Sequence, residues 1–322
     1  MIIDSHSHFG RDFYCGKISI EEYISCCNKI GVTTGFLMPS PWPIYTKDCK
    51  EITSLIWEHQ NYVNKRYFRL EDGTNKIEIF KNPYYEVNYS YNDFLKNVDS
   101  SVNLMFVPLM HGVLDNAEYF EKMLDDINPP AVKIHNFGSG FSIDKINMDL
   151  VDIIRSKNIP LIIHTSVYNY DYGYGASTRY FRNECHPYLW AKFLVENNIR
   201  GVLNHGACLN KEAINLVNSS DNLMIGIGPD LDISRDFFKV DIEKDVYLSN
   251  NYLCLLKNIS SANKLLFDID FNWNLDGEKY DVQQINRLMK VWNTDELENI
   301  LCKNALQFFE LHEHNCRIRK HR

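Results

Sequence analysis

The chain has 322 residues, of which 45% are hydrophobic and 24% are charged, with a formal net charge of -8. This profile is typical of a soluble globular protein, and the length suits one barrel-sized domain or two smaller ones. The negative charge argues against nucleic acid as a partner. No apolar run approaches the roughly 18 residues that a membrane span needs. Nine cysteines are scattered without a Cys-x-x-Cys pair, which argues against a disulfide framework and a thiolate metal site.

The first eight residues, MIIDSHSH, predict a short buried strand that ends in two histidines. Side chains alternate along a strand, so His6 and His8 point to the same side. Because a cleaved leader would remove this pair, we expect no leader and a cytoplasmic protein. A helix is expected next, between Ser19 as its N-cap and Gly31 at its end.

Strands and helices then alternate along most of the chain. Eight short apolar segments predict strands, at 1–8, 32–38, 103–109, 131–135, 159–165, 200–205, 223–227 and 264–271. Further helices are expected at 48–64, 115–127, 144–157, 187–197 and 210–218, and up to about residue 313. Apolar strands separated by helices indicate a parallel sheet covered on both faces. Eight such units predict an α/β fold, a single-domain (β/α)8 TIM barrel over residues 1–322.

Residues 65–91 do not fit this alternation. Tyr67–Leu70 and Lys76–Phe80 flank an Asp-Gly turn, which is typical of a β-hairpin. We interpret the segment as a hairpin or loop inserted into the barrel. It could cover the site or lie on the surface far from it.

Polar side chains stand at the C-terminal ends of five predicted strands. They are His6, His8, Lys133, His135, His164, His205, Asp268 and Asp270. These strand ends meet at one rim of a barrel, where active sites are built. A single histidine there is more often structural, but this combination is difficult to explain as core packing. Imidazole and carboxylate ligands suit zinc, manganese, iron or cobalt, so the sequence predicts a metal site.

These motifs resemble the amidohydrolase superfamily, and most closely its amidohydrolase 2 (amidohydrolase-related) branch of hydrolases and decarboxylases. The matching segments are IDSHSH at 3–8, VKIH at 132–135, IHT at 163–165, NHG at 204–206, LFDID at 266–270 and the closing ILCKNALQFF at 300–309. They follow the family's order over the whole chain, with the weakest similarity between 42 and 100. The resemblance implies a metal-dependent barrel enzyme and says nothing of the substrate.

The resemblance also implies a ligand set. His6, His8, His164 and Asp270 would bind one divalent metal ion, with zinc favoured and manganese, iron or cobalt as alternatives. His205 would be either a further ligand or a catalytic acid and base. Asp270, rather than Asp268, matches the family's aspartate on strand eight, although alternation alone cannot choose between the two.

Four residues are predicted to face the substrate. Lys133 stands where binuclear members of the superfamily carry a metal-bridging lysine, but we favour one metal ion, with Lys133 and His135 as substrate contacts. Arg179 and Arg182 follow a tyrosine-rich loop after strand five. Because guanidinium groups bind carboxylates in a bidentate fork, they predict a small anionic, carboxylated substrate. The alternative is a surface loop unrelated to the substrate. His111, after strand three, could also reach the rim.

The leading interpretation is metal-dependent hydrolysis of an amide, cyclic amide or lactone. Asp270 would take the proton of a metal-activated water, and His205 would stabilise the oxyanion. The alternative is a non-oxidative decarboxylase of an aromatic or unsaturated acid, in which Asp270 or His205 protonates carbon. A non-catalytic barrel used for binding or assembly is the third hypothesis. The oligomeric state, including a homo-oligomer, is left open.

Overall fold

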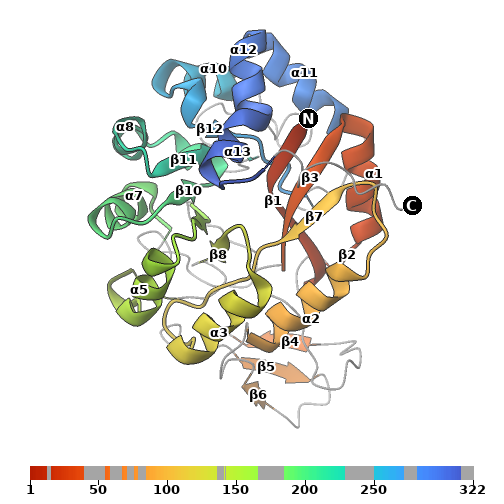
Figure 1. The fold of residues 1–322 in the computed structure, drawn as a ribbon, viewed down its shortest axis with the longest axis vertical. Coiled ribbons are helices and arrows are strands. Elements are labelled where there is room, and N and C mark those ends of the chain that lie inside the picture. Colours follow the sequence, from red (N-terminus) through yellow and green to blue (C-terminus); the bar gives the residue numbers. More distant parts are fainter. Residues whose placement is uncertain are drawn as a thin grey trace.

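The computed structural model describes residues 1–12, 16–39, 55–58, 67–70, 76–78, 85–135, 141, 143–165, 185–228, 250–271 and 281–312. In this part of the chain, parallel strands alternate with helices that surround them (Figure 1). The strands are β1 (Ile2–Asp12), β3 (Val32–Pro39), β7 (Asn103–Phe106), β8 (Val132–Ile134), β9 (Leu161–Ile163), β10 (Gly201–Leu203), β11 (Leu223–Gly226) and β12 (Leu265–Leu266). Each of the eight predicted strands is therefore present.

Two parallel sheets close into one barrel. The orders are β1-β3-β7, with the short β2 (Gly16–Ile18) antiparallel beside β1, and β8-β9-β10-β11-β12. A parallel bridge between Leu109 and Lys133 joins the end of the first sheet to β8. At the other seam, the Ser5 N–H donates to the Phe267 carbonyl (2.9 Å), and the Asp270 N–H donates to the His6 carbonyl (2.8 Å). Strand order therefore follows chain order around a ring, as predicted for a (β/α)8 barrel.

Apart from the helix at 85–96, which was not predicted, the helices that cover the strands lie close to their predicted positions. They are α1 (Ile20–Ile30), α2 (Tyr85–Lys96), α3 (Ala117–Ile127), α5 (Met148–Ser156), α7 (Pro187–Glu196), α8 (Lys211–Ser219), α10 (Asn250–Ile259), α11 (Asp281–Val291), α12 (Thr294–Glu298) and α13 (Asn304–Phe308). Short 3-10 turns span Ile143–Lys145 and Ala262–Lys264, and a π turn spans Asn299–Lys303. In α1, Ser19 caps the first turn and Gly31, with φ of 80°, ends the helix, as predicted. No helix in the described ranges combines the length and apolarity of a membrane crossing.

The region between β3 and β7 departs from the prediction. Residues 55–58 form a strand, β4 (Leu55–Glu58), within the segment 48–64 that was predicted as a helix. A short segment such as LIWE, with three apolar residues and one glutamate, fits a strand or a helix equally well, and here pairing with β5 (Tyr67–Leu70) decides. β5 also pairs with β6 (Lys76–Glu78), which confirms the predicted hairpin. These strands lie outside the ring of helices (Figure 1); that they form an insertion, and that residues 1–322 are one domain, stay predictions.

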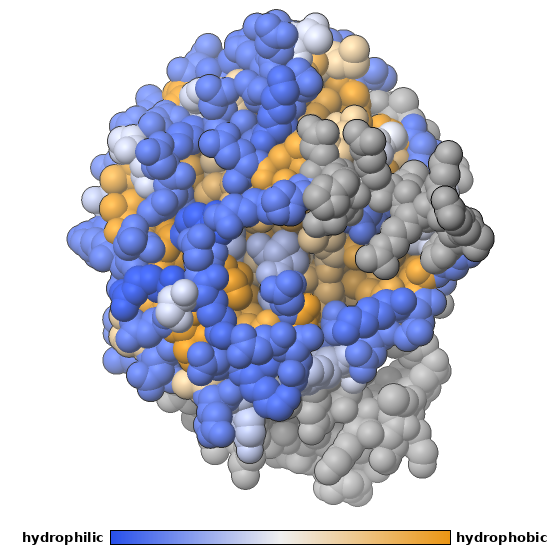
Figure 2. Space-filling view, in the orientation of Figure 1, coloured by the Kyte–Doolittle hydropathy of each residue, from blue (hydrophilic) through white to orange (hydrophobic). Residues whose placement is uncertain are grey.

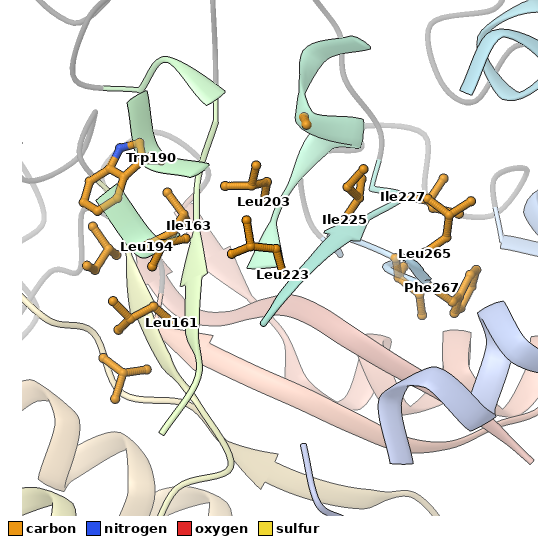
Figure 3. Packing of buried hydrophobic residues seen from close by; sticks show 14 of the residues in the cluster. Leu161, Ile163, Trp190, Leu194, Leu203, Leu223, Ile225, Ile227, Leu265 and Phe267 are labelled. Atoms are coloured by element: carbon orange, nitrogen blue, oxygen red, sulfur yellow. The ribbon is translucent and has the colours of Figure 1, made fainter. Parts of the chain in front are cut away.

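Side chains on β9 to β12 alternate between two apolar clusters. The cluster toward the helices includes Leu161, Ile163, Leu203, Leu223, Ile225, Leu265 and Phe267, with Trp190 and Leu194 of α7 (Figure 3). The residues between them form the second cluster, inside the barrel: Ile162, Val202, Met224 and Leu266, with Ile3, Phe36, Val107 and Ala131 from the other strands. Because side chains alternate along a strand, each of these strands contributes residues to both the outer and the inner cluster.

The end of the chain closes the N-terminal end of the barrel. Phe308 and Phe309 pack against the inner cluster, with the Phe309 ring 4.7 Å from that of Phe36. Arg200 donates to the Phe308 carbonyl (2.8 Å) and to Glu310 Oε1 (2.7 Å), which fixes this end of α13. Figure 2 shows this face, with polar side chains over the outer helices and apolar ones toward its middle.

Candidate active site

The barrel interior changes from apolar to polar at one level. Four residues of the inner cluster are each followed, two positions later, by a polar residue. The pairs are Ala131 and Lys133, Ile162 and His164, Val202 and Asn204, and Leu266 and Asp268. Because side chains alternate along a strand, these polar groups face inward as the apolar ones do. Lys133, Asn204 and Asp268 are 0% exposed. The C-terminal half of the barrel is therefore lined by groups that can bind ions or move protons.

A bulge in β1 directs His6 and His8 into this interior. Asp4 pairs with Gly35 and Ser7 pairs with Leu37, so β1 takes three steps where β3 takes two. The extra residue reverses the alternation, and bulges often redirect side chains next to active sites. Asp4 and Ser7 consequently face α1, whereas His6 and His8 face the barrel axis.

A left-handed turn brings His205 to the same place. Residues His205 to Leu209 all have positive φ, between 47° and 60°. This conformation costs roughly 1–2 kcal/mol for each residue with a side chain. Because Asn204 already faces inward, ordinary alternation would send His205 outward. The strained turn places its Nδ1 3.8 Å from Asp270 Oδ2 instead, and Asp270 itself has φ of 51°.

His6, His8 and Asp270 form the centre of the site. One ligand atom from each lies within 4.8 Å of the others, and all three residues are buried. Asp270 Oδ1 is 3.6 Å from His6 Nδ1 and 3.7 Å from His8 Nε2. Among the described residues, His6 Nδ1 is buried without a hydrogen-bond partner. A buried nitrogen of this kind needs a partner, and a metal ion would supply one.

The protonation states also suit a metal ion. His8 Nδ1 lies 3.1 Å from the Pro39 carbonyl, so it carries the proton and leaves the Nε2 lone pair directed at Asp270. Burial, with the nearby Lys133 charge, lowers the pKa of His8 to about 3 and that of His6 well below its usual range. Neutral imidazole is the form that binds metals. These residues therefore fit a divalent cation.

The remaining histidines lie beside this cluster. His164 Nδ1 is 2.9 Å from His205 Nε2, and the His135 ring stacks on the His164 ring at 4.0 Å. His164 is thus in the site but bonded to His205, and its role as a fourth ligand stays a prediction. Lys133 Nζ lies 2.9 Å from His6 Nε2, and burial lowers the pKa of Lys133 to about 7. The substrate contacts predicted for Lys133 and His135 stay predictions, and Arg179 and Arg182 lie outside the described residues.

Asp268 lies deeper than Asp270 and belongs to a different set of contacts. Its Oδ1 accepts a short hydrogen bond from Ser5 Oγ across the barrel seam, and burial raises the pKa of Asp268 well above its usual range. A Cβ atom on Gly226 would lie 1.9 Å from its Oδ2, so glycine is needed there. The preference for Asp270 over Asp268 as the ligand agrees with this geometry.

Asp4 stabilises the bulge in β1 through hydrogen bonds on the side of the strand that faces α1. Sequence reasoning missed this role. Its Oδ1 accepts the backbone N–H groups of His6 (3.2 Å) and Ile269 (2.9 Å), and its Oδ2 accepts the hydroxyls of Ser7 (2.6 Å) and Tyr23 (2.7 Å). Burial raises the pKa of Asp4 to about 6 against the effect of these donors. The clue in the sequence was a carboxylate directly after the apolar pair Ile2 and Ile3 at the start of a predicted buried strand.

The contact between Tyr23 and Gly35 allows a test of this support. A Cβ atom on Gly35 would lie 1.9 Å from Tyr23 Oη. We expect Gly35→Ala to lower the free energy of unfolding by about 1–3 kcal/mol, as overpacking does, measured by urea denaturation. Tyr23→Phe removes the clashing oxygen, so the two changes together should cost less than their sum. Strictly additive losses would contradict this contact.

Solved structures with the same fold cover nearly the whole chain. A 5-carboxyvanillate decarboxylase from Sphingomonas paucimobilis is 10% identical over 97% of this chain and 99% of its own, with a TM-score of 0.61. A dihydroxybenzoic acid decarboxylase from Polaromonas sp. JS666, solved with manganese and the inhibitor 2-nitroresorcinol, is 10% identical over 98% of both chains, with a TM-score of 0.59. A putative amidohydrolase from Staphylococcus aureus is 12% identical over 96% and 99%, with a TM-score of 0.57.

These likenesses define the class of the fold. At such identities they show the fold alone: the chain has the fold of solved structures that are called amidohydrolases and aromatic acid decarboxylases, so the expected resemblance is confirmed at the level of the fold. No protein-family model and no curated protein matches the chain.

Proposed function

We propose that this protein is a metal-dependent enzyme that decarboxylates a small aromatic acid without oxidation. The observation that carries the proposal is the buried cluster of His6, His8 and Asp270 at the C-terminal end of the barrel. It combines nitrogen and oxygen donors suited to zinc or manganese with a second titratable pair, His164 and His205, that reaches Asp270.

His6, His8 and Asp270 would hold the metal ion, with His164 as the further predicted ligand. When bound, a divalent ion supplies a positive centre that binds substrate oxygens and stabilises negative charge. Lys133 adds a positive group that acts on both histidines of β1. A site of this charge favours a substrate that carries a carboxylate.

Asp270 and His205 are the groups placed to move a proton. His205 has one ring nitrogen 3.8 Å from Asp270 Oδ2 and the other 2.9 Å from His164 Nδ1. In the proposed reaction, a proton from Asp270 or His205 adds to the ring carbon that bears the carboxylate. The carbon–carboxylate bond then breaks, its electron pair restores the aromatic ring, and carbon dioxide leaves. The residue that gave the proton recovers one from water.

Hydrolysis of an amide, cyclic amide or lactone, the leading interpretation from the sequence, is the second candidate. It is favoured by the same position of Asp270, which could take the proton of a water molecule instead. The named activities of similar structures support decarboxylation better, because two of the three described above are called aromatic acid decarboxylases. We therefore place decarboxylation first.

Metal-loaded protein should release carbon dioxide from a hydroxylated benzoate. A panel that includes 5-carboxyvanillate and 2,6-dihydroxybenzoate would be assayed in D2O, with deuterium expected on the carbon that lost the carboxylate. A matched panel of lactones and cyclic amides would be assayed in ¹⁸O-labelled water. Label from water in a product formed without carbon dioxide would establish hydrolysis instead. A purified protein that holds no metal, and whose thermal stability does not respond to a chelator, would support the non-catalytic barrel.

A further inference from the structure

The backbone at Asp270 is held from both sides by side chains of β1. Directly before it, the Ile269 N–H donates to Asp4 Oδ1 (2.9 Å). Directly after it, the Phe271 N–H donates to Ser7 Oγ (3.1 Å). Asp4 and Ser7 are both 0% exposed, so both acceptors are out of contact with solvent. Two side chains of one strand therefore fix the segment that carries the Asp270 carboxylate.

The hydroxyl group of Ser7 is oriented by its own hydrogen bonds. Its proton is donated to Asp4 Oδ2 (2.6 Å), which also accepts the Tyr23 hydroxyl (2.7 Å). Because a hydroxyl has only one proton, the Ser7 oxygen meets the Phe271 N–H with a lone pair. The Phe271 ring also packs against the Tyr23 ring, with the ring centroids 5.4 Å apart. The residue that follows Asp270 is therefore held through both its backbone and its side chain.

The conformation held in this way is a strained one. Asp270 has φ of 51°, a left-handed value that residues with a Cβ atom avoid. Its own N–H donates to the His6 carbonyl (2.8 Å), so β1 binds the three successive N–H groups of residues 269–271. In this conformation Asp270 Oδ1 lies 3.6 Å from His6 Nδ1 and 3.7 Å from His8 Nε2. Strain of this kind persists only where the surrounding structure imposes it.

We propose that Ser7, together with Asp4, is a positioning residue of the metal site. It keeps the Asp270 carboxylate directed at the two histidines of β1. The inference rests on the metal site of the proposed function and is independent of the reaction catalysed there. Ser7 stands between His6 and His8 in the sequence, but the bulge in β1 turns its side chain toward α1. Ser7 therefore acts through the backbone around Asp270 and does not touch the metal ion or the substrate.

This role predicts a loss that depends on the metal ion. Without the hydroxyl of Ser7, the backbone at Asp270 is free to leave its left-handed conformation. The strain that is released then offsets part of the lost hydrogen bond in the metal-free protein. Metal binding has to restore the strained conformation, so the cost of the substitution appears mainly as reduced affinity for the metal ion.

Ser7→Ala and Ser5→Ala form a matched pair of variants. Both serines are buried neighbours of His6 on β1, but Ser5 Oγ donates to Asp268 Oδ1 and to the Phe267 carbonyl instead. Manganese affinity would be measured by competition with a chelator. We expect Ser7→Ala to bind manganese roughly 10- to 100-fold more weakly than the wild type, as loss of a group that orients a metal ligand does. Ser5→Ala should bind it as the wild type does.

Urea denaturation with and without manganese provides a second readout. A ligand that binds only the native state stabilises it according to its affinity. Ser7→Ala should therefore lose more stability, relative to the wild type, in the presence of manganese than in its absence. Ser5→Ala should lose the same amount in both conditions, as expected of a residue with a structural role alone.

The outcomes separate this inference from the proposed function. Unchanged manganese affinity in Ser7→Ala would overturn the inference, and so would an equal loss of affinity in both variants. A wild type that binds no metal ion would overturn the inference and the proposed function together. A wild type that binds manganese but releases no carbon dioxide from the panel of acids would refute decarboxylation and leave the inference intact.

Hydrogen exchange of the wild type decides the question if Ser7→Ala does not fold. The Phe271 N–H should exchange slowly, and more slowly still when manganese is added, because the ion stabilises the conformation in which Ser7 accepts this group. Exchange as fast as in an unstructured chain, or a rate that manganese does not change, would refute the role of Ser7.

Discussion

The Asp270→Asn variant is expected to purify as a folded barrel that has lost its metal ion and its activity. Asp270 Oδ1 is the atom that approaches both His6 Nδ1 and His8 Nε2, and a neutral amide oxygen is a much weaker ligand than a carboxylate. Asparagine tolerates the positive φ of this position, so the backbone should not change. Metal affinity should fall by more than the roughly 10- to 100-fold that loss of an outer-shell partner costs, measured by competition with a chelator.

Asp268→Asn is the matched control for this experiment. It makes the same chemical change two residues earlier, on the same face of the strand and also in the barrel interior. Its amide oxygen can still accept the hydrogen bond from Ser5, so we expect metal content close to that of the wild type. If Asp268→Asn loses the metal and Asp270→Asn retains it, the ligand assignment on this strand is wrong.

The parts of the site that sequence reasoning could predict follow from periodicity. The change from apolar to polar residues at the strand ends is visible in the sequence at Lys133, His164 and Asp268, because each follows an inward apolar residue by two positions. Parallel strands in a closed barrel then bring these ends together. No knowledge of side-chain contacts is needed for that step.

Other parts depend on backbone irregularities that have no clear sequence signal. The bulge between Asp4 and Ser7 changes which face His6 occupies, and the left-handed turn after Asn204 does the same for His205. Only Gly206 in that turn has a residue type that favours positive φ. Each irregularity is stabilised by distant partners, such as Tyr23 for Asp4, which local sequence cannot specify.

Elements that do not follow the regular alternation of strands and helices were harder to predict for a related reason. Helix α2 has a mixed polar sequence, and it was not predicted. Its buried Asn88 bonds both the N–H and the C=O of Leu109, so a tertiary contact with the end of β7 helps to hold it in place. β4 likewise depends on its partner β5. In both cases long-range pairing overrides a weak local preference.

Asp115 should make the stability of the protein depend on pH. Burial raises the pKa of its carboxyl group from 3.8 to about 7, and its Oδ1 has no hydrogen-bond partner among the described residues. Between these two values the native state holds a proton that the unfolded chain has released. The stability contributed by this protonated carboxyl is therefore present at low pH and is lost as the pH rises through about 7.

Asp115→Asn should remove this dependence. The variant keeps an oxygen that can accept the His111 N–H, and its side chain stays neutral. Relative to the wild type, its free energy of unfolding should rise by about 4 kcal/mol between pH 4 and pH 8, at 1.36 kcal/mol for each pKa unit. Urea denaturation of both proteins across this range measures the difference. Asp93→Asn, at an exposed position on α2, is the control for the substitution itself and should change stability by only about 0.5 kcal/mol.

A pH-independent difference between Asp115→Asn and the wild type would contradict the raised pKa. If the expected rise is found, a buried carboxylate that destabilises the protein at neutral pH has been retained beside His111. Among the described residues, its carboxylate accepts the His111 N–H, at the start of the turn after β7. The burial of this carboxylate is then a cost in stability that the fold carries at the turn after β7.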